Sequence, residues 1–229
     1  MVIPVGERYQ QTLCLMTKQD GELVREELRP TLFVPMAGTA EANREVQPDP
    51  TVPTIVNGSF ERVAESSDTE SSDTGVSADA SDTERHIPGW YYQRLATVVE
   101  DPLTAPHHDR FIHFSNDTPG RSSHVLQGFA IDGRKVREIT LSGSIRLEEV
   151  QQGTDAQMRP SIAVTFYDER RRQLGHHFCG PWQGTRMWEK AAKQFRVPPS
   201  TREAILRIGL FGATGDFYVD NLSVSVDRN

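Results

Sequence analysis

Apolar residues alternate with other residues along the last part of the chain and predict two long β-strands. From Leu206 to Leu210 every second residue is a large aliphatic one, which is the period of a strand with one buried face. A second alternating run ends at Val226, and its apolar parity changes at residues 220–221. Such a change predicts either a β-bulge or burial of both faces of the strand. We expect residues 204–226 to form two neighbouring strands of a β-sandwich.

Shorter apolar runs, separated by turn residues, occupy the middle of the chain. The strands expected there cover 111–114, 125–131, 137–147, 160–167, 174–178 and 194–197. Turn signals such as Asp132-Gly133 and Gln152-Gly153 fall between them. Only residues 187–193 fit a helical pattern. Short strands at this spacing predict a mostly β fold, a jelly-roll β-sandwich.

The first residues of the chain predict a smaller β unit. Apolar residues at 1–5 and alternation over 9–18 indicate two strands. Asp20-Gly21 then predicts a hairpin turn, because a type I′ turn needs positive φ angles that glycine adopts freely. Residues 23–35 return as the partner strand. Since an isolated hairpin is marginally stable in water, we expect this unit to pack against another part of the protein.

Two polar tracts divide the chain. Residues 41–53 are rich in Pro, Glu and Thr and predict a linker. Residues 65–86 repeat E-S-S-D-T in tandem and contain no aromatic residue. They cannot bury enough apolar surface to offset the entropy of ordering, which predicts a disordered acidic insertion. The expected units are therefore residues 1–40 and a sandwich over 54–229 that contains the insertion.

The overall charge and the cysteines narrow the class of protein. The formal net charge is -7, which argues against a nucleic-acid partner because such proteins need a basic surface. No apolar run approaches the roughly 20 residues of a membrane span, and the first residues lack the pattern of a secretory signal. We therefore expect no membrane partner and a cytoplasmic location.

Cys14 and Cys179 are far apart in sequence and predict buried thiols rather than a disulfide.

Two segments near the start carry a resemblance to a known enzyme family. V-I-P-V-G-E-R-Y-Q-Q-T-L at 2–13 and D-G-E-L-V-R-E-E-L-R-P-T-L-F-V-P-M at 20–36 resemble the end of a protein-L-isoaspartate O-methyltransferase. The resemblance implies that residues 1–40 are the C-terminal strand and β-hairpin of an α/β methyltransferase sheet. It also implies a role in protein repair, with a protein substrate bound through the methyltransferase part.

The family's catalytic half has no counterpart in this sequence. The resemblance places the Gly-rich loop and the acidic residue that bind S-adenosylmethionine upstream of the matching part, and neither is present. No catalytic residue can be carried over. We therefore expect S-adenosylmethionine to bind only if an upstream domain is present, and no methyl transfer by this chain alone.

Several motifs between residues 54 and 227 carry a second resemblance. They are N-G-S-F-E at 57–61, P-G-W at 88–90, W-x6-F-x-V-P at 188–198 and V-D-N-L-S-V at 219–224. Their order and spacing resemble carbohydrate-binding modules with a galactose-binding-like jelly roll. The resemblance implies a non-catalytic accessory module and a glycan ligand. An alternative is a β-sandwich that binds a protein or stabilises an attached enzyme without binding sugar.

The same resemblance suggests a structural calcium ion near the first and last strands. The matching residues are Glu61 and Asp220, whose carboxylate oxygens suit Ca²⁺. The alternative is that both side chains accept hydrogen bonds from turn amides.

Sugar-binding modules stack pyranose rings on exposed aromatic side chains, which makes the aromatic residues candidates. Trp182, in a Gly- and Pro-containing loop, is the first candidate for an exposed ring, with Tyr91 or Tyr92 beside it. Trp90 and Trp188 are expected to lie in the core, because large aromatic residues dominate cores.

No residue is nominated for catalysis or for a transition-metal site. The histidine doublets 107–108 and 176–177 cannot chelate a metal as strand neighbours, because adjacent strand residues point to opposite faces. No carboxylate pair stands out as a glycosidase would require. We expect the histidines to lie on solvated strand faces.

Overall fold

The computed structural model describes residues 1–7, 10–19, 21–31, 48–63 and 86–226, and these residues form β-strands and turns. Most of the expected linker at 41–53 and of the expected insertion at 65–86 lies outside the described residues. Within the described ranges, no helix has the length and apolar character needed to span a membrane.

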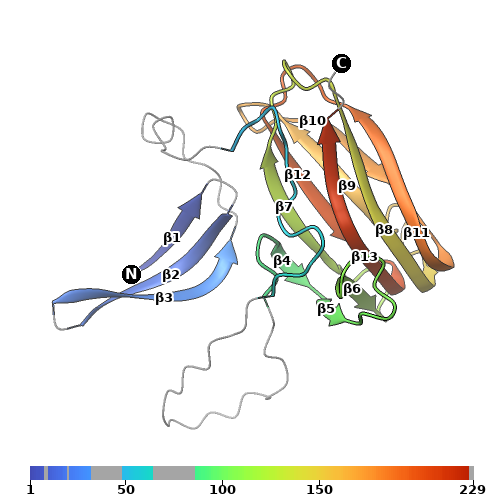
Figure 1. Ribbon diagram of the computed structural model, residues 1–229, viewed down its shortest axis with the longest axis horizontal. Helices are drawn as coiled ribbons and strands as arrows, with labels where there is room; N and C mark the ends of the chain where they lie inside the picture. Colours follow the sequence, from blue (N-terminus) through green and yellow to red (C-terminus); the bar gives the residue numbers. More distant parts are fainter. Residues whose placement is uncertain (8–9, 20, 32–47, 64–85, 227–229) are drawn as a thin grey trace, which may run out of the picture.

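The strands form three antiparallel sheets (Figure 1). The N-terminal sheet consists of β1 (Val2–Glu7), β2 (Gln10–Gln19) and β3 (Glu22–Thr31) in that order. We call the second one sheet C. In the order β10-β9-β12-β7-β4, it contains β4 (Tyr91–Arg94), β7 (His124–Ala130), β9 (Ser161–Tyr167), β10 (Gln173–Cys179) and β12 (Glu203–Gly209). We call the third one sheet D. In the order β11-β8-β13-β6-β5, it contains β5 (Ala96–Glu100), β6 (Arg110–Asn116), β8 (Glu138–Gln151), β11 (Gly184–Arg196) and β13 (Thr214–Val226).

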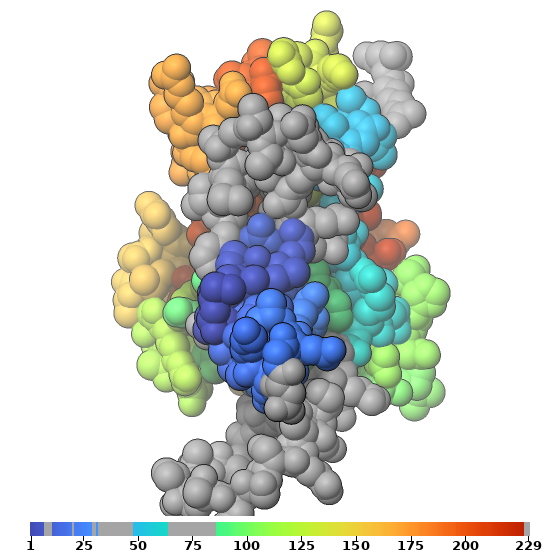
Figure 2. Space-filling view, turned by 90° about the vertical axis from the view of Figure 1, so that its left-hand side faces the viewer, coloured from blue at the N-terminus to red at the C-terminus, as the bar shows by residue number. Residues whose placement is uncertain are grey.

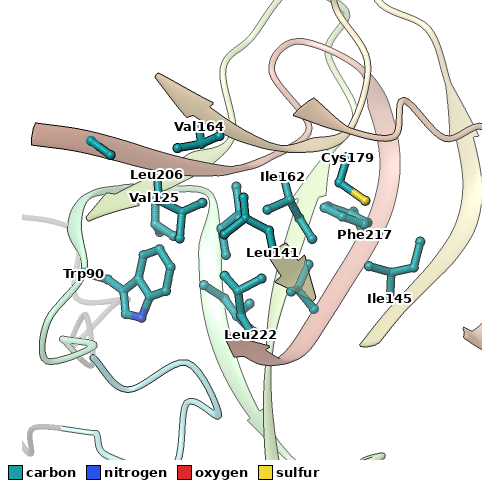
Figure 3. Packing of buried hydrophobic residues seen from close by; sticks show 14 of the residues in the cluster. Trp90, Val125, Leu141, Ile145, Ile162, Val164, Cys179, Leu206, Phe217 and Leu222 are labelled. Atoms are coloured by element: carbon teal, nitrogen blue, oxygen red, sulfur yellow. The ribbon is translucent and has the colours of Figure 1, made fainter. Parts of the chain in front are cut away.

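Sheets C and D face each other and enclose one hydrophobic core, so the expected jelly-roll β-sandwich is confirmed. Alternate residues of both sheets point inward (Figure 3), including Ile162 and Leu206 of sheet C and Leu141 and Phe217 of sheet D. All four have 0–1% of their surface exposed. Every second residue of a strand faces the same side. The residues between the inward-pointing ones therefore face away from the core and form an outer face on each sheet.

The two closing strands lie in different sheets, which corrects the expectation that they are neighbours. β12 pairs with β7 and β9 in sheet C, whereas β13 pairs with β6 and β8 in sheet D. The apolar period of a strand defines its buried face but does not say whether the next turn closes a hairpin or crosses to the facing sheet. Of the two alternatives expected at 220–221, a bulge or burial of both faces, the structure has the bulge, since the β13–β8 register shifts between Asp220 and Ser223.

Residues 187–193 form part of β11 rather than a helix. β11 lies at the edge of sheet D and pairs with β8 from residue 189 to residue 196. The sequence Glu189-Lys190-Ala191-Ala192-Lys193 has good intrinsic helix formers. Hydrogen bonding to a long neighbouring strand overrides that local preference.

The N-terminal sheet packs beside the β4 edge of the sandwich. Gly21, with φ of 94°, lies in the turn that joins β2 to β3, so the expected hairpin is confirmed. β3 contacts β4, and a hydrogen bond joins the backbone of Gln11 to the Tyr91 hydroxyl. Figure 2 shows this sheet from the side on which it covers the sandwich edge. Both cysteines are free and buried, as expected; Cys14 belongs to this unit and Cys179 to the sandwich.

Phe217 tests how much of the stability comes from the sandwich core. Its ring is fully buried and lies 6.1 Å from that of Phe114. Phe217→Ala is expected to lower the free energy of unfolding by about 3–5 kcal/mol, because it removes apolar contacts and leaves a cavity. Urea unfolding followed by tryptophan fluorescence measures this change. Leu103→Ala is the control, since Leu103 is 94% exposed, and a loss of similar size there would contradict the assignment of the core.

Candidate ligand-binding face

Four aromatic side chains gather on the outer face of sheet D. Phe111 and His113 come from β6, Trp188 from β11 and Tyr218 from β13. The Phe111 ring lies 5.4 Å from that of Trp188 and 5.9 Å from that of Tyr218. Phe111 and Tyr218 are 2% and 8% exposed, whereas Trp188 is half-buried. The cluster therefore has a buried floor and a more exposed tryptophan at its edge.

Tyr218 is held between two neighbouring strands. His113 on β6 and Arg146 on β8 are its direct cross-strand partners, so all three side chains share one face. The His113 ring stacks on the Tyr218 ring at 4.4 Å with an angle of 8° between the planes. The guanidinium carbon of Arg146 lies 4.1 Å from the centre of the tyrosine ring, a cation–π distance. These contacts fix the orientation of the phenol.

Two carboxylates border the same aromatic residues. The Tyr218 hydroxyl donates to Glu148 Oε2 at 3.0 Å, and Arg146 Nη2 donates to Glu148 Oε1 at 2.7 Å. His113 Nε2 lies 2.7 Å from Asp216 Oδ1. Burial raises the pKa of Tyr218, and the Glu148 carboxylate raises it further. The phenol therefore stays a hydrogen-bond donor at neutral pH.

Two buried donors of the cluster have no acceptor among the described residues. They are Trp188 Nε1 and Arg146 Nε. A buried donor that makes no hydrogen bond costs about 1–3 kcal/mol. Both donors are enclosed by the protein and are not open to a ligand, whereas the exposed hydrogen-bonding groups of this face are the carboxylates of Glu148 and Asp216.

The position of Trp188 corrects the expectation that it is a core residue. The register between β11 and β8 shifts between Arg186 and Glu189, and Trp188 lies on the outer face against Phe111. The sequence W-x6-F spaces Trp188 from Phe195, which is buried in the core. A spacing of seven puts the two residues on opposite faces of a regular strand. That parity is the signal which could have identified Trp188 as an outer residue.

The three predicted sugar-binding aromatics do not meet in space. Tyr91 is 3% exposed, and burial raises its pKa to about 12, so it offers no open ring for stacking. Tyr92 is 54% exposed on the same strand, β4. Trp182 lies in the loop between β10 and β11 and packs partly into the core, 5.7 Å from the Phe217 ring. β4 and β10 are the opposite edges of sheet C, which separates Trp182 from both tyrosines.

The N-G-S-F-E motif at residues 57–61 packs against the bulge of β13. Asn57 and Phe60 adopt positive φ angles of 52° and 58°. The Gly58 carbonyl accepts from the Leu222 amide at 2.8 Å, and a Cβ at Gly58 would collide with the Leu222 carbonyl oxygen. Glycine at this position therefore lets the loop approach the strand closely. The turn places Glu61 near Asp220, which precedes the bulge.

The Asp220 carboxyl is buried with one oxygen unsatisfied. Its side chain is 0% exposed, and Oδ1 accepts from the Asn221 amide at 2.5 Å. Oδ2 has no partner among the described residues. Burial raises the pKa of Asp220 to about 7, with a further contribution from the charge of Glu61. Backbone hydrogen bonds from Asn221 and His107 and the charge of His108 act to lower this pKa, but burial outweighs them.

Glu61 accepts hydrogen bonds from turn amides, as the alternative interpretation expected. Its Oε1 lies 3.1 Å from the Arg110 amide and 3.3 Å from the Asp109 amide. In the described part of the chain, no group of three or more His, Cys, Asp or Glu side chains is arranged to hold a metal ion. Any calcium ion at Asp220 would therefore depend on backbone carbonyls for most of its ligands, which is common for Ca²⁺.

Comparisons with known proteins give structural neighbours only. No protein-family model and no curated protein matches the sequence. The chain is similar to a family 16 carbohydrate-binding module, with 16% identity and a TM-score of 0.47 over 75% of this chain and 98% of that one. It is also similar to the CBM22-1-GH10 modules of xylanase 10B from Clostridium thermocellum complexed with xylohexaose, with 16% identity and a TM-score of 0.43 over 61% and 26%.

A third neighbour is the enzymatically active domain of tailspike protein 4 from bacteriophage CBA120, with 14% identity and a TM-score of 0.42. The match covers 58% of this chain and 18% of that one. Likenesses at 14–16% identity and TM-scores of 0.42–0.47 carry no inference about a ligand. The β-sandwich is established by the chain's own strand pairing.

The raised pKa of Asp220 makes stability depend on pH in calcium-free buffer. Between the ordinary value of 3.8 and about 7, the folded protein holds a proton that the unfolded chain releases, so the free energy of unfolding falls as pH rises toward 7. Lowering the pH from about 8 to about 5 should stabilise the wild type more than Asp220→Asn, which cannot ionise. Thermal unfolding across this range measures the difference. The exposed Asp117→Asn control should behave like the wild type, and identical pH profiles for all three would contradict the prediction.

Proposed function

We propose that the chain is a non-catalytic glycan-binding module whose ligand lies on the outer face of sheet D. The observation that carries this proposal is the fixed Tyr218 ring, held between His113 and Arg146 and hydrogen bonded to Glu148. Aromatic rings beside a few oriented polar groups suit sugars, which have an apolar C–H face and a rim of hydroxyls. The outer face of sheet D supplies both parts.

The accessible groups of the cluster define how a sugar would contact it. Trp188 is half-buried, while the side chains of Asp216 and Glu148 are 35% and 47% exposed. In the proposed complex the sugar ring stacks on the indole, and the two carboxylates accept hydrogen bonds from sugar hydroxyls. Phe111 and Tyr218 lie beneath and keep these contacting groups in place.

The carboxylates on this face are engaged in ways that disfavour glycoside hydrolysis. Glu148 accepts from both Tyr218 and Arg146, and Asp216 contacts His113. A glycosidase needs a carboxylic acid with a raised pKa that reaches the glycosidic oxygen. Asp220 has a strongly raised pKa but is fully buried. These contacts support binding without catalysis.

The finer predictions for residues 1–40 stay predictions. The described residues of this segment form an antiparallel three-stranded sheet, and no comparison points to a methyltransferase. A role in S-adenosylmethionine-dependent repair of isoaspartyl residues therefore remains a hypothesis about a longer protein that would contain this chain. The alternative of a stabilising or protein-binding sandwich is weaker, because it gives no role to the oriented rings and carboxylates around Tyr218.

The glycan-binding proposal is tested on Trp188. Trp188→Ala is expected to weaken binding to soluble oligosaccharides by about tenfold or more, because it removes the stacking surface. A glycan array identifies the ligand, and isothermal titration calorimetry measures the affinity.

The matched control is Met187→Ala, which removes an adjacent side chain that is 79% exposed. It should bind like the wild type. Equal affinity of Trp188→Ala and the wild type, or a loss in both variants, would place the site elsewhere.

We also propose that Asp220 and Glu61 help to hold a structural Ca²⁺ ion. The support is the unsatisfied and buried Asp220 Oδ2, together with the electrostatic coupling of the two carboxylates. A cation there would neutralise both charges and occupy the free carboxylate oxygen. The ion would fix the N-G-S-F-E loop against β13 and would take no part in sugar contacts.

Calcium is expected to raise the melting temperature of the chelator-treated wild type. An ion that binds only the folded state stabilises it by about 2.7 kcal/mol at a hundredfold excess over its Kd. Asp220→Asn should lose most of this increase, whereas Asp117→Asn should keep it. Differential scanning calorimetry with and without Ca²⁺ provides the measurement. An equal increase in wild type and Asp220→Asn would rule out this site.

A further inference from the structure

A group of positively charged and imidazole side chains lies on the outer face of sheet C, away from the proposed sugar site on sheet D. Arg94 of β4 is the direct cross-strand partner of His124 on β7. Arg207 of β12 pairs with Leu126, two residues along β7 from His124. Residues two apart on a strand share a face, so Arg94, His124 and Arg207 are neighbours on one surface.

The Phe211 ring contacts two members of this group, His124 and Arg207. It stacks on the His124 ring at 6.0 Å with an angle of 22° between the planes. The guanidinium carbon of Arg207 lies 5.8 Å from the centre of the same ring, within cation–π range. The Phe211 ring therefore positions the imidazole and the guanidinium beside each other.

The backbone around Phe211 is fixed against the start of β7. The amides of Leu210 and Phe211 both donate to the Ser123 carbonyl, at 2.9 and 3.4 Å. Gly209 has φ of 151°, and a Cβ there would collide with the Ser123 carbonyl oxygen. Glycine is thus required for the close approach of the two segments. The arrangement of Phe211 and His124 is built into the fold rather than set by loose surface side chains.

The charges on this surface lack acidic partners. Within residues 48–63 and 86–226, no carboxylate forms an ion pair with Arg94 or Arg207. At the opposite end of sheet C, by contrast, Arg171 pairs with Glu203 at 3.0 Å and Arg202 with Asp132 at 3.1 Å. Two guanidinium groups without an acidic partner among the described residues are unexpected in a protein whose net charge is -7.

The surroundings of His124 favour its neutral form, and one of its two ring nitrogens, Nε2, remains free to contact a ligand. Burial lowers its pKa, and the positive charges of Arg207 and Arg94 lower it further. Those two arginines, from β12 and β4, are the charged groups that act on it. Its Nδ1 lies 2.7 Å from Ser122 Oγ, while Nε2 has no partner among the described residues. In the tautomer in which the Ser122 hydroxyl donates to Nδ1, Nε2 carries the proton and is an N–H donor, and in the protonated ring Nε2 is a donor as well.

We propose that Arg94, His124 and Arg207 form a binding site for an oxyanion, the carboxylate or phosphate group of a small ligand. Guanidinium groups donate hydrogen bonds to oxyanions in a planar fork, and the imidazole Nε2 adds a further donor. An oxyanion also offsets the positive charges of the two arginines, which lower the pKa of His124. This site is independent of the proposed glycan site, since it lies on the other sheet.

Binding at this site is expected to be coupled to protonation of His124. A bound anion offsets the positive field that disfavours the imidazolium form, so it should raise the pKa of His124. By linkage, the affinity for the anion should rise as pH falls through the titration of His124, because the protonated ring binds the anion more strongly.

The experiment follows the His124 ring signals by NMR during titration of the whole chain. The probes are sodium phosphate and sodium D-glucuronate, with sodium chloride at matched ionic strength and neutral D-glucose as controls. Saturable shifts with both anions indicate a general oxyanion site. A shift with only one of them identifies a phosphate or a carboxylate site, and either result supports the proposal.

Two variants separate the site from general surface charge. Arg207→Gln should weaken binding by about tenfold or more and remove the anion-dependent change in the His124 pKa. Arg196→Gln removes the same charge from an exposed position of β11 in sheet D and should bind like the wild type. The dispersion of the spectrum shows whether each variant is folded. The proposal is overturned if neither anion shifts the His124 signals, if chloride reproduces the shifts, or if Arg207→Gln binds like the wild type.

Discussion

The two-residue period of β13 is the constraint on which the rest of the structure depends. Phe217 and Val219 point into the core, while Tyr218, between them, points outward to the aromatic face. The strand pairs with both β6 and β8 at this point, so it lies in the middle of sheet D. A slip of one residue in its register would exchange the core residues for the candidate binding residues. Core stability and the geometry of the outer face are therefore set by the same hydrogen bonds.

The bulge in β13 gives the same strand a second structural role, because it contacts the N-G-S-F-E loop beside Asp220. It lies between Asp220 and Ser223 and follows directly on the residues that build the aromatic face. The Leu222 amide, within the bulge, donates to the N-G-S-F-E loop through the Gly58 carbonyl. Asp220 is thereby buried under that loop with one oxygen unsatisfied. Polar groups buried without partners are costly, and Asp220 Oδ2 is one such group beside the proposed calcium position.

The outer faces of the two sheets differ in chemistry although both belong to one sandwich. Sheet D combines aromatic rings with the carboxylates of Glu148 and Asp216, which suits a neutral polyhydroxylated ligand. Sheet C carries Arg94 and Arg207 around His124, which suits an anion. Because the core lies between the sheets, ligands on the two faces would not compete for the same residues. A single small fold can thus present two separate binding surfaces.

The sequence by itself determined which residues alternate between core and surface, because that pattern follows from the local geometry of a strand. The mostly β class followed from this alternation, the hairpin at Gly21 from its turn residues and the core position of Trp90 from its size. The parity change at 220–221 left a bulge and burial of both faces as alternatives, and the structure has the bulge. The site was predictable only in part. Glu61 and Asp220 could be paired from their motifs, while Tyr218 and Arg146 carry no local signal of their role.

Only the tertiary structure decided which strands are neighbours. β12 and β13 pair with different strands and so lie in different sheets, and pairing with β8 made residues 187–193 part of a strand. The Trp188 ring came to lie against Phe111 of β6, and Tyr91 was buried where the N-terminal sheet meets β4. These outcomes depend on contacts between residues far apart in the chain. Local periodicity contains no information about such contacts, since it specifies a face and not the partner that covers it.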